Sequence, residues 1–122
     1  VFYNCRSENA QADIGPHHRW AMGTLFDNII TDGEINIQDR GNWGTGHGWA
    51  GVNQILWNCT AAKATVQNPY VSGQNYSIGL KGQKTSGRLK NRPDGNWEGN
   101  NDAGLEPASL YLMQVREAKK RK

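Results

Sequence analysis

The chain of 122 residues lacks any long apolar run, and apolar residues make up only 36% of it. A membrane-spanning helix needs about 20 consecutive apolar residues, so the sequence predicts no transmembrane segment. The first residues, Val1 to Asn4, also lack the basic and apolar regions of a signal peptide. The low apolar fraction favours a thin, elongated core over a thick globular one.

Runs of helix-favouring residues are also missing except near the C-terminus, whereas glycine is abundant, with 15 residues. Turns are therefore expected to occupy much of the chain. The chain begins with Val1 instead of methionine, and its first residues read as part of a strand. We therefore expect a processed product or a piece of a longer protein.

The positive charge is unevenly distributed, although the net value is +3. Lys119, Lys120, Arg121 and Lys122 end the chain, and without them ten Lys and Arg residues face eleven Asp and Glu residues. A solvated basic tail accounts for this distribution, and a phosphate-binding arm is the alternative. We predict no nucleic-acid partner and no membrane partner.

Three short segments resemble one another: Phe2-Tyr3-Asn4-Cys5, Leu25-Phe26-Asp27-Asn28 and Leu56-Trp57-Asn58-Cys59. Each places an apolar residue and an aromatic one ahead of Asn or Asp. The repetition predicts a β-solenoid in which Tyr3, Phe26 and Trp57 stack in register. Three unrelated strands that share an aromatic residue are the alternative.

The same stacking bears on the two cysteines, which occupy equivalent places in the first and third segments. Two coils of separation, roughly 9–10 Å, exceed the Cα distance that a disulfide can bridge. Cys5 and Cys59 are therefore expected to be buried free thiols.

The domain organisation follows from short strand signals over 1–5, 23–31, 34–39, 51–59, 64–67 and 77–80. Ile35 and Ile37 alternate with polar residues, as in a strand with one dry face. These signals place the coils of the solenoid in 1–82. Residues 83–105 predict a long surface excursion, and 106–122 predict a helix that caps the open end of the solenoid, with the basic tail.

Chemistry-bearing side chains gather in two segments, and in a solenoid both would share one lateral surface. The candidate catalytic residues are His17, His18, Arg19 and His47. The candidate substrate-binding residues are Trp20, Arg40, Trp43 and Trp49. Histidine exchanges protons near neutral pH, arginine holds carboxylates and aromatic faces cover sugar rings. A rigid structural corner at 15–20 and a partly exposed Asp39–Arg40 ion pair are the alternatives.

The sequence assigns no metal ligands. Adjacent histidines on a strand point in opposite directions, so His17 and His18 do not suit a shared zinc ion. Calcium would suit the oxygen-rich segment around Asp94, Asn100, Asn101 and Asp102, although no EF-hand spacing is present. The cofactor is therefore left unassigned.

The segment from Gly15 to Gly82 contains the strings Gly-Pro-His-His-Arg-Trp, Gly-Thr-Gly-His-Gly-Trp-Ala-Gly and Leu-Trp-Asn-Cys. It resembles the C-terminal coils of secreted bacterial right-handed parallel β-helix proteins of the pectate-lyase-like superfamily. The resemblance implies an all-β parallel β-helix, a secreted or periplasmic parent protein and an acidic polysaccharide partner. Complete members have more coils, so we expect a fragment or a homo-oligomer that completes the solenoid core.

Two functions remain open, because that superfamily includes lyases, hydrolases and non-catalytic binders. The first is a carbohydrate-active module of a lyase that cleaves acidic polysaccharide by β-elimination. In it His17 or His18 would be the base, and Arg19 or Arg40 would neutralise the carboxylate. The second is a non-catalytic β-solenoid that binds polysaccharide or serves as a structural unit.

Overall fold

The computed structural model describes residues 1–17, 21–43, 46–69, 73–99 and 105–121. The strands within these ranges are β1 (Phe2–Tyr3), β2 (Arg6–Ser7), β3 (Leu25–Asp27), β4 (Ile30–Thr31), β5 (Glu34–Ile37), β6 (Ile55–Trp57), β7 (Thr60–Val66), β8 (Tyr76–Ile78), β9 (Lys81–Lys84) and β10 (Asn96–Glu98). The helix α1 spans Leu110–Lys120.

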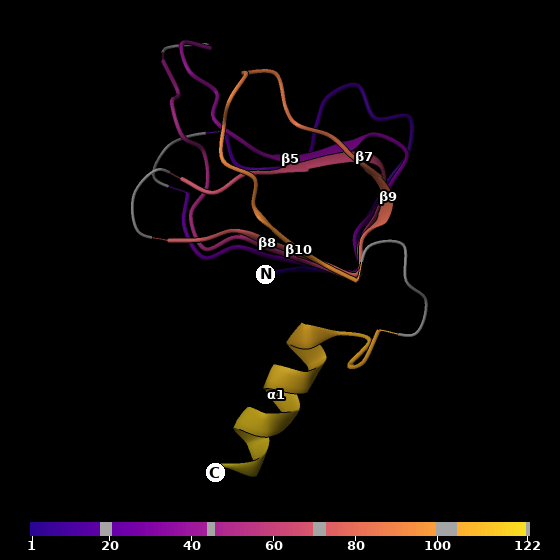
Figure 1. Cartoon of the computed structure of the whole chain (residues 1–122). Helices are drawn as coiled ribbons and strands as arrows, with labels where there is room; N and C mark the ends of the chain where they lie inside the picture. Colours follow the sequence, from indigo (N-terminus) through magenta and orange to yellow (C-terminus); the bar gives the residue numbers. More distant parts are fainter. Residues whose placement is uncertain (18–20, 44–45, 70–72, 100–104, 122) are drawn as a thin grey trace.

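The strands form two sheets, and the chain passes from one to the other repeatedly (Figure 1). Sheet A has the order β1-β3-β6-β8-β10. Sheet B has the order β2-β4-β7-β5, with β9 also paired to β7. All pairings between these named strands are parallel. The molecule is therefore mostly parallel β-structure, which is compatible with a solenoid.

The core lies between the two sheets and follows the predicted alternation. Ile35 and Ile37 on β5 and Ala64 and Val66 on β7 are fully buried in the core. Asn36 and Thr65, which lie between them, point to the outer face of the sheet and are also buried there. Leu56 on β6 meets the core residues from sheet A. At the β1 end this core is uncovered, and a hollow of about 310 Å³ opens among apolar side chains.

The predicted stacking of Tyr3, Phe26 and Trp57 is wrong by one residue. Phe2 pairs with Phe26, which pairs with Leu56, while Tyr3 and Trp57 both flank Asp27. The rings of Phe2 and Phe26 stack 5.7 Å apart.

A left-handed corner explains this register. Asn4, Asn28 and Asn58 each follow a sheet A strand with φ of 53°, 57° and 52°, and Gly79 and Gly99 continue the series at 73° and 61°. Asn and Gly adopt this conformation most readily. The corner, not the aromatic residue, therefore aligns the coils, and Asn58 Nδ2 donates to Asn28 Oδ1 at 3.2 Å.

The C-terminal helix is attached to the outer side of sheet A (Figure 1). Asp27 is completely buried there and accepts hydrogen bonds from Ser109 Oγ at 2.9 Å and the Tyr111 backbone N–H at 2.6 Å. Ser109 is the N-cap, so α1 begins at Leu110 and not near Pro107. The expectation that this helix caps the end of the solenoid is therefore corrected, because the outward-facing Asp27 fixes it beside the sheet.

The range 83–105, expected as a surface excursion, also contributes β10 to sheet A. Trp97 on this strand packs against the core. Within the described ranges, no helix combines the length and the apolar character that crossing a bilayer requires.

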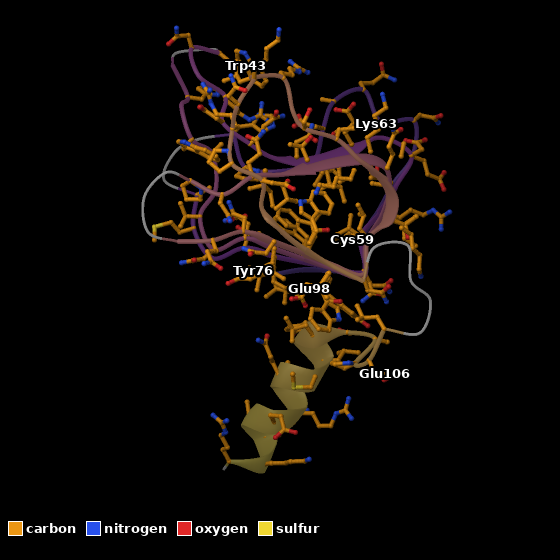
Figure 2. All side chains as sticks on the ribbon, viewed as in Figure 1. Trp43, Cys59, Lys63, Tyr76, Glu98 and Glu106 are labelled. Carbon is orange, nitrogen blue, oxygen red and sulfur yellow. The ribbon has the colours of Figure 1, made fainter. Side chains whose placement is uncertain are left out.

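Both cysteines are free thiols, as predicted, but only Cys59 is buried. The backbone N–H of Ile30 donates to Cys5 O, and that of Thr60 donates to Ile29 O. Cys5, Ile29 and Cys59 therefore occupy equivalent positions in successive coils. Cys5 is exposed because it lies in the first coil, with no coil above it in this chain. Figure 2 shows Cys59 between the two sheets.

Stability should fall in alkali because of Cys59. Burial raises the pKa of its thiol from 9.0 to about 11. Between these values the folded chain holds a proton that the unfolded chain releases, so raising the pH from 9 to 11 should cost on the order of 2–3 kcal/mol. Urea unfolding across this range should show a flatter pH dependence for Cys59→Ala than for the wild type. Identical slopes would contradict the prediction.

Asp27→Ala should detach the start of α1. The change removes the acceptor for Ser109 and Tyr111, and hydrogen bonds to a charged group contribute roughly 1.5–3 kcal/mol each. We expect a lower urea midpoint and a weaker helical signal in far-UV circular dichroism. Glu98→Ala is the matched control, since Glu98 holds the equivalent position on β10 and is exposed. Equal behaviour of the two variants would refute this role.

Candidate functional site

The outer face of sheet B carries a regular grid of polar side chains. Because Ile35 and Ile37 point inward, their neighbours on β5 point outward, and the same holds on β7. Strand pairing then aligns three rows across β5, β7 and the continuation of β9. The rows are Glu34, Lys63 and Gln83; Asn36, Thr65 and Thr85; and Gln38, Gln67 and Gly87.

Three loops border this face (Figure 1). They are the Asn9 loop (residues 8–13), the Trp43 loop (described residues 39–43 and 46–49) and the Arg88 loop (residues 85–92). Between them lie a depression of about 490 Å³, lined by Asp13, Glu34, Lys63 and Arg88, and an adjoining one of about 200 Å³. We call the two depressions together the sheet B groove.

The Asn9 loop is held by Asp32, which lies in the turn between β4 and β5. The Asp32 carboxylate accepts the backbone N–H groups of Ala10 at 3.0 Å and Asn9 at 2.6 Å. These two bonds lower the pKa of Asp32. Asp32 therefore stays ionised and serves to shape one wall of the groove.

The Arg88 loop is bonded to the grid itself. Thr65 and Thr85 share a hydrogen bond of 2.6 Å, and Gln67 Nε2 donates to Ser86 O at 2.9 Å. The Arg88 backbone N–H donates to Gln38 Oε1 at 3.2 Å. Part of the polar grid thus positions the loop, and the remaining side chains line the groove.

Asp13 organises the edge of the groove next to the Trp43 loop. Its carboxylate binds Arg40 at 2.6 Å, lies 3.3 Å from His17 Nε2 and accepts the Asn36 amide at 3.2 Å. Arg40 also donates to Pro16 O at 3.3 Å. These contacts join two segments that lie about one coil apart in the sequence.

Trp43 links the edge to the groove. The Arg88 guanidinium lies 4.6 Å and the Arg40 guanidinium 5.5 Å from the centre of its ring. Both are cation–π contacts. Figure 2 shows Trp43 and Lys63 on the same outer side of sheet B.

The cations at this site fall into two groups. Arg40 is paired with Asp13, and Arg92 is paired with Asp39 at 2.6 Å. Lys63 and Arg88 are exposed and form no ion pair with any described residue. The structural cations are therefore neutralised, while the charges of Lys63 and Arg88 remain available to a ligand.

The structure brings together several of the residues expected to form a site. His17 lies at the groove edge, Arg40 is buried and Trp43 is half-buried beside it. The backbone N–H of His47 donates to Trp43 O at 3.1 Å. Trp49 forms an antiparallel β-bridge with Asp39. Three further candidates, His18, Arg19 and Trp20, lie outside the described residues.

Four residues of the groove were not predicted: Asp13, Asn36, Lys63 and Arg88. The alternation of apolar and polar residues along 34–38 contained the signal for Asn36. For Lys63 the strand was predicted from residue 64, one position too late. Asp13 and Arg88 lie in loops, and nothing in their local sequence indicates where those loops fold.

Of the four residues considered for calcium, the structure describes Asp94. Among the described residues, no three His, Cys, Asp or Glu side chains lie close enough to bind one ion. Asp94 instead contacts Lys84 and accepts Trp97 Nε1 at 2.9 Å. The other calcium candidates, Asn100, Asn101 and Asp102, lie outside the described residues.

Comparison of this chain with known protein families, curated proteins and solved structures finds no match.

Proposed function

We propose that this chain is a module of a right-handed parallel β-helix protein that binds acidic polysaccharide in the sheet B groove. The parallel strands in two sheets support this fold, and the strings of the pectate-lyase-like superfamily noted above point the same way. One observation carries the function: Lys63 and Arg88 are exposed and form no ion pair with any described residue. The groove around them is lined by amides, hydroxyls and the carboxylates of Asp13, Asp32 and Glu34.

The chemistry of the groove suits a charged sugar chain. The exposed amide of Gln11 and the half-buried hydroxyl of Thr85 can exchange hydrogen bonds with sugar hydroxyls. Asn36 and Gln38 are buried and support the loops around the groove. Charge-assisted bonds from Lys63 and Arg88 would hold the carboxylates or sulfates of such a chain. Trp43 would hold the Arg88 guanidinium in place for an acid group, since that guanidinium lies 4.6 Å from the centre of its ring. An extended groove fits an extended polymer.

Removing both free cations should weaken this binding. We expect Lys63→Gln with Arg88→Gln to reduce affinity for pectate at least about tenfold, because charged hydrogen bonds contribute roughly 1.5–3 kcal/mol each. Isothermal titration calorimetry with a short pectate oligomer at low salt measures this affinity. Arg6→Gln with Lys81→Gln is the matched control, since it removes one Arg and one Lys outside the groove.

Binding by the wild type should also fall as salt is raised, because exposed charges are screened. Two results would overturn the proposal. One is wild-type binding that is equal for pectate and an uncharged polysaccharide. The other is an equal loss in the groove variant and the control.

A second candidate function is β-elimination, favoured by the contact between His17 and Asp13 at the groove edge. Asp13 would orient His17 as the base. The imidazole would accept the C5 proton of a uronate. The electron pair of the broken C5–H bond would form the C4–C5 double bond, and the C4–O bond would break. The departing oxygen would take a proton from solvent. Arg88 would neutralise the carboxylate, since Arg40 is already bonded to Asp13.

Lyase activity should produce an unsaturated sugar with a new absorbance band. We expect His17→Ala to lower the rate by about 10²–10⁴-fold, the usual contribution of a general base, while pectate affinity measured by calorimetry stays unchanged. Absence of the band with pectate, alginate and glycosaminoglycans would reject the lyase and leave the binding proposal standing.

A further inference from the structure

A second cleft lies beside α1, on the side of the molecule away from the sheet B groove. It has a volume of about 440 Å³ and lies between the helix and the corner where β1 and β3 end. Its lining includes Tyr3, Asn4, Asn28, Leu112, Met113 and Arg116. Figure 1 shows α1 projecting from sheet A, whereas the groove lies on sheet B.

The helix presents a basic face to this cleft. Lys119 and Lys120 lie three and four residues after Arg116, and Arg116 lies four residues after Leu112, so the three cations lie near the face of Leu112. All three cations are exposed. Lys120 is paired with Glu117 at 3.4 Å, whereas Arg116 and Lys119 form no ion pair within the described part of the chain. The lining of the cleft itself contains one cation, Arg116, and one exposed carboxylate, Glu106. Lys119 and Lys120 continue the row of cations along the helix, beyond the cleft.

The opposite wall of the cleft supplies other groups. Tyr3 is 37% exposed, and its ring meets Tyr111 at 5.5 Å. The side-chain amide of Asn4 makes no hydrogen bond with any described residue, whereas the amides of Asn28 and Asn58 both donate to Ala108 O. An aromatic face, a free amide and a cation thus border one cleft.

The outer turns of α1 have little to stabilise them. No residue of the helix is buried, and an isolated helix shorter than about 12–15 residues is marginal in water. Its first turn is fixed by Asp27, but Arg116 and Lys120 form a like-charge pair four residues apart. A negatively charged ligand along the basic face would remove this repulsion.

We propose that this cleft is a second binding site for acidic oligosaccharide. Arg116 binds one acid group, the Tyr3 ring covers a sugar face and Asn4 bonds its hydroxyls. Lys119 and Lys120 bind the next acid groups along the chain. The inference takes its ligand class from the proposed function. A cleft with the aromatic ring of Tyr3 in its wall favours a single sugar chain over a bilayer or a duplex, which would meet only the helix.

The test is the number of pectate oligomers bound per chain, measured by isothermal titration calorimetry. The wild type should bind two. Arg116→Gln with Lys119→Gln should lower affinity at one site at least tenfold, and the groove variant K63Q/R88Q should do so at the other. The control variant R6Q/K81Q removes the same number of positive charges and should retain both binding sites. Far-UV circular dichroism checks that α1 persists, and Tyr3→Ala tests the cleft without changing the charge.

The outcomes separate the two proposals. One wild-type site that the groove variant abolishes would overturn the second site and leave the proposed function intact. One site that only R116Q/K119Q abolishes would overturn the groove and support the cleft. Full affinity in R116Q/K119Q or in Tyr3→Ala would refute the cleft. Tighter retention of duplex DNA or of phosphatidylserine vesicles by the helix would overturn the ligand class.

Discussion

The left-handed corner that ends each strand of sheet A is the constraint on which the rest of the structure depends. Asn4, Asn28, Asn58, Gly79 and Gly99 occupy it in successive coils. Residue types other than Gly, Asn and Asp rarely adopt this left-handed conformation, so the corner fixes where each coil turns. A slip of one residue would exchange the inward and outward faces of every strand. The corner therefore decides that Phe26 enters the core while Asp27 faces out to hold α1.

The same register determines what lies on the outside of sheet B. Once Ile35 and Val66 point inward, Asn36 and Thr65 must point outward next to each other. Parallel stacking repeats this alternation on each coil, so the outward polar residues of neighbouring strands lie next to one another in rows. The loops between strands add Arg88 and Asp13 at the edges of the rows. The groove is thus a consequence of coil stacking and needs no special local sequence.

The sequence predicted the strands better than their alignment. Alternation at Ile35 and Ile37 identified β5 correctly, and the equivalent positions of Cys5 and Cys59 were recognised. The alignment of the second repeat was wrong because aromatic residues were matched, whereas Asn28 sets the corner. α1 was predicted, but not its place, since nothing local indicates that Asp27 caps it. Likewise, pairing of Arg40 with Asp13 depends on contact between coils, which a local pattern does not encode.

The distribution of charge links fold and proposed function. Asp13, Asp39 and Asp32 are each bonded to a cation or to backbone N–H groups, and these bonds shape the loops. Among the described residues, the cations without an ion pair include Lys63 and Arg88 in the groove and Arg116 and Lys119 on α1. A long polyanion that reached both would gain from effective concentration, because the second contact becomes intramolecular. A body that is close to neutral overall can therefore bind acid groups at the groove, where Asp13 is already paired with Arg40 and Asp32 with backbone N–H groups.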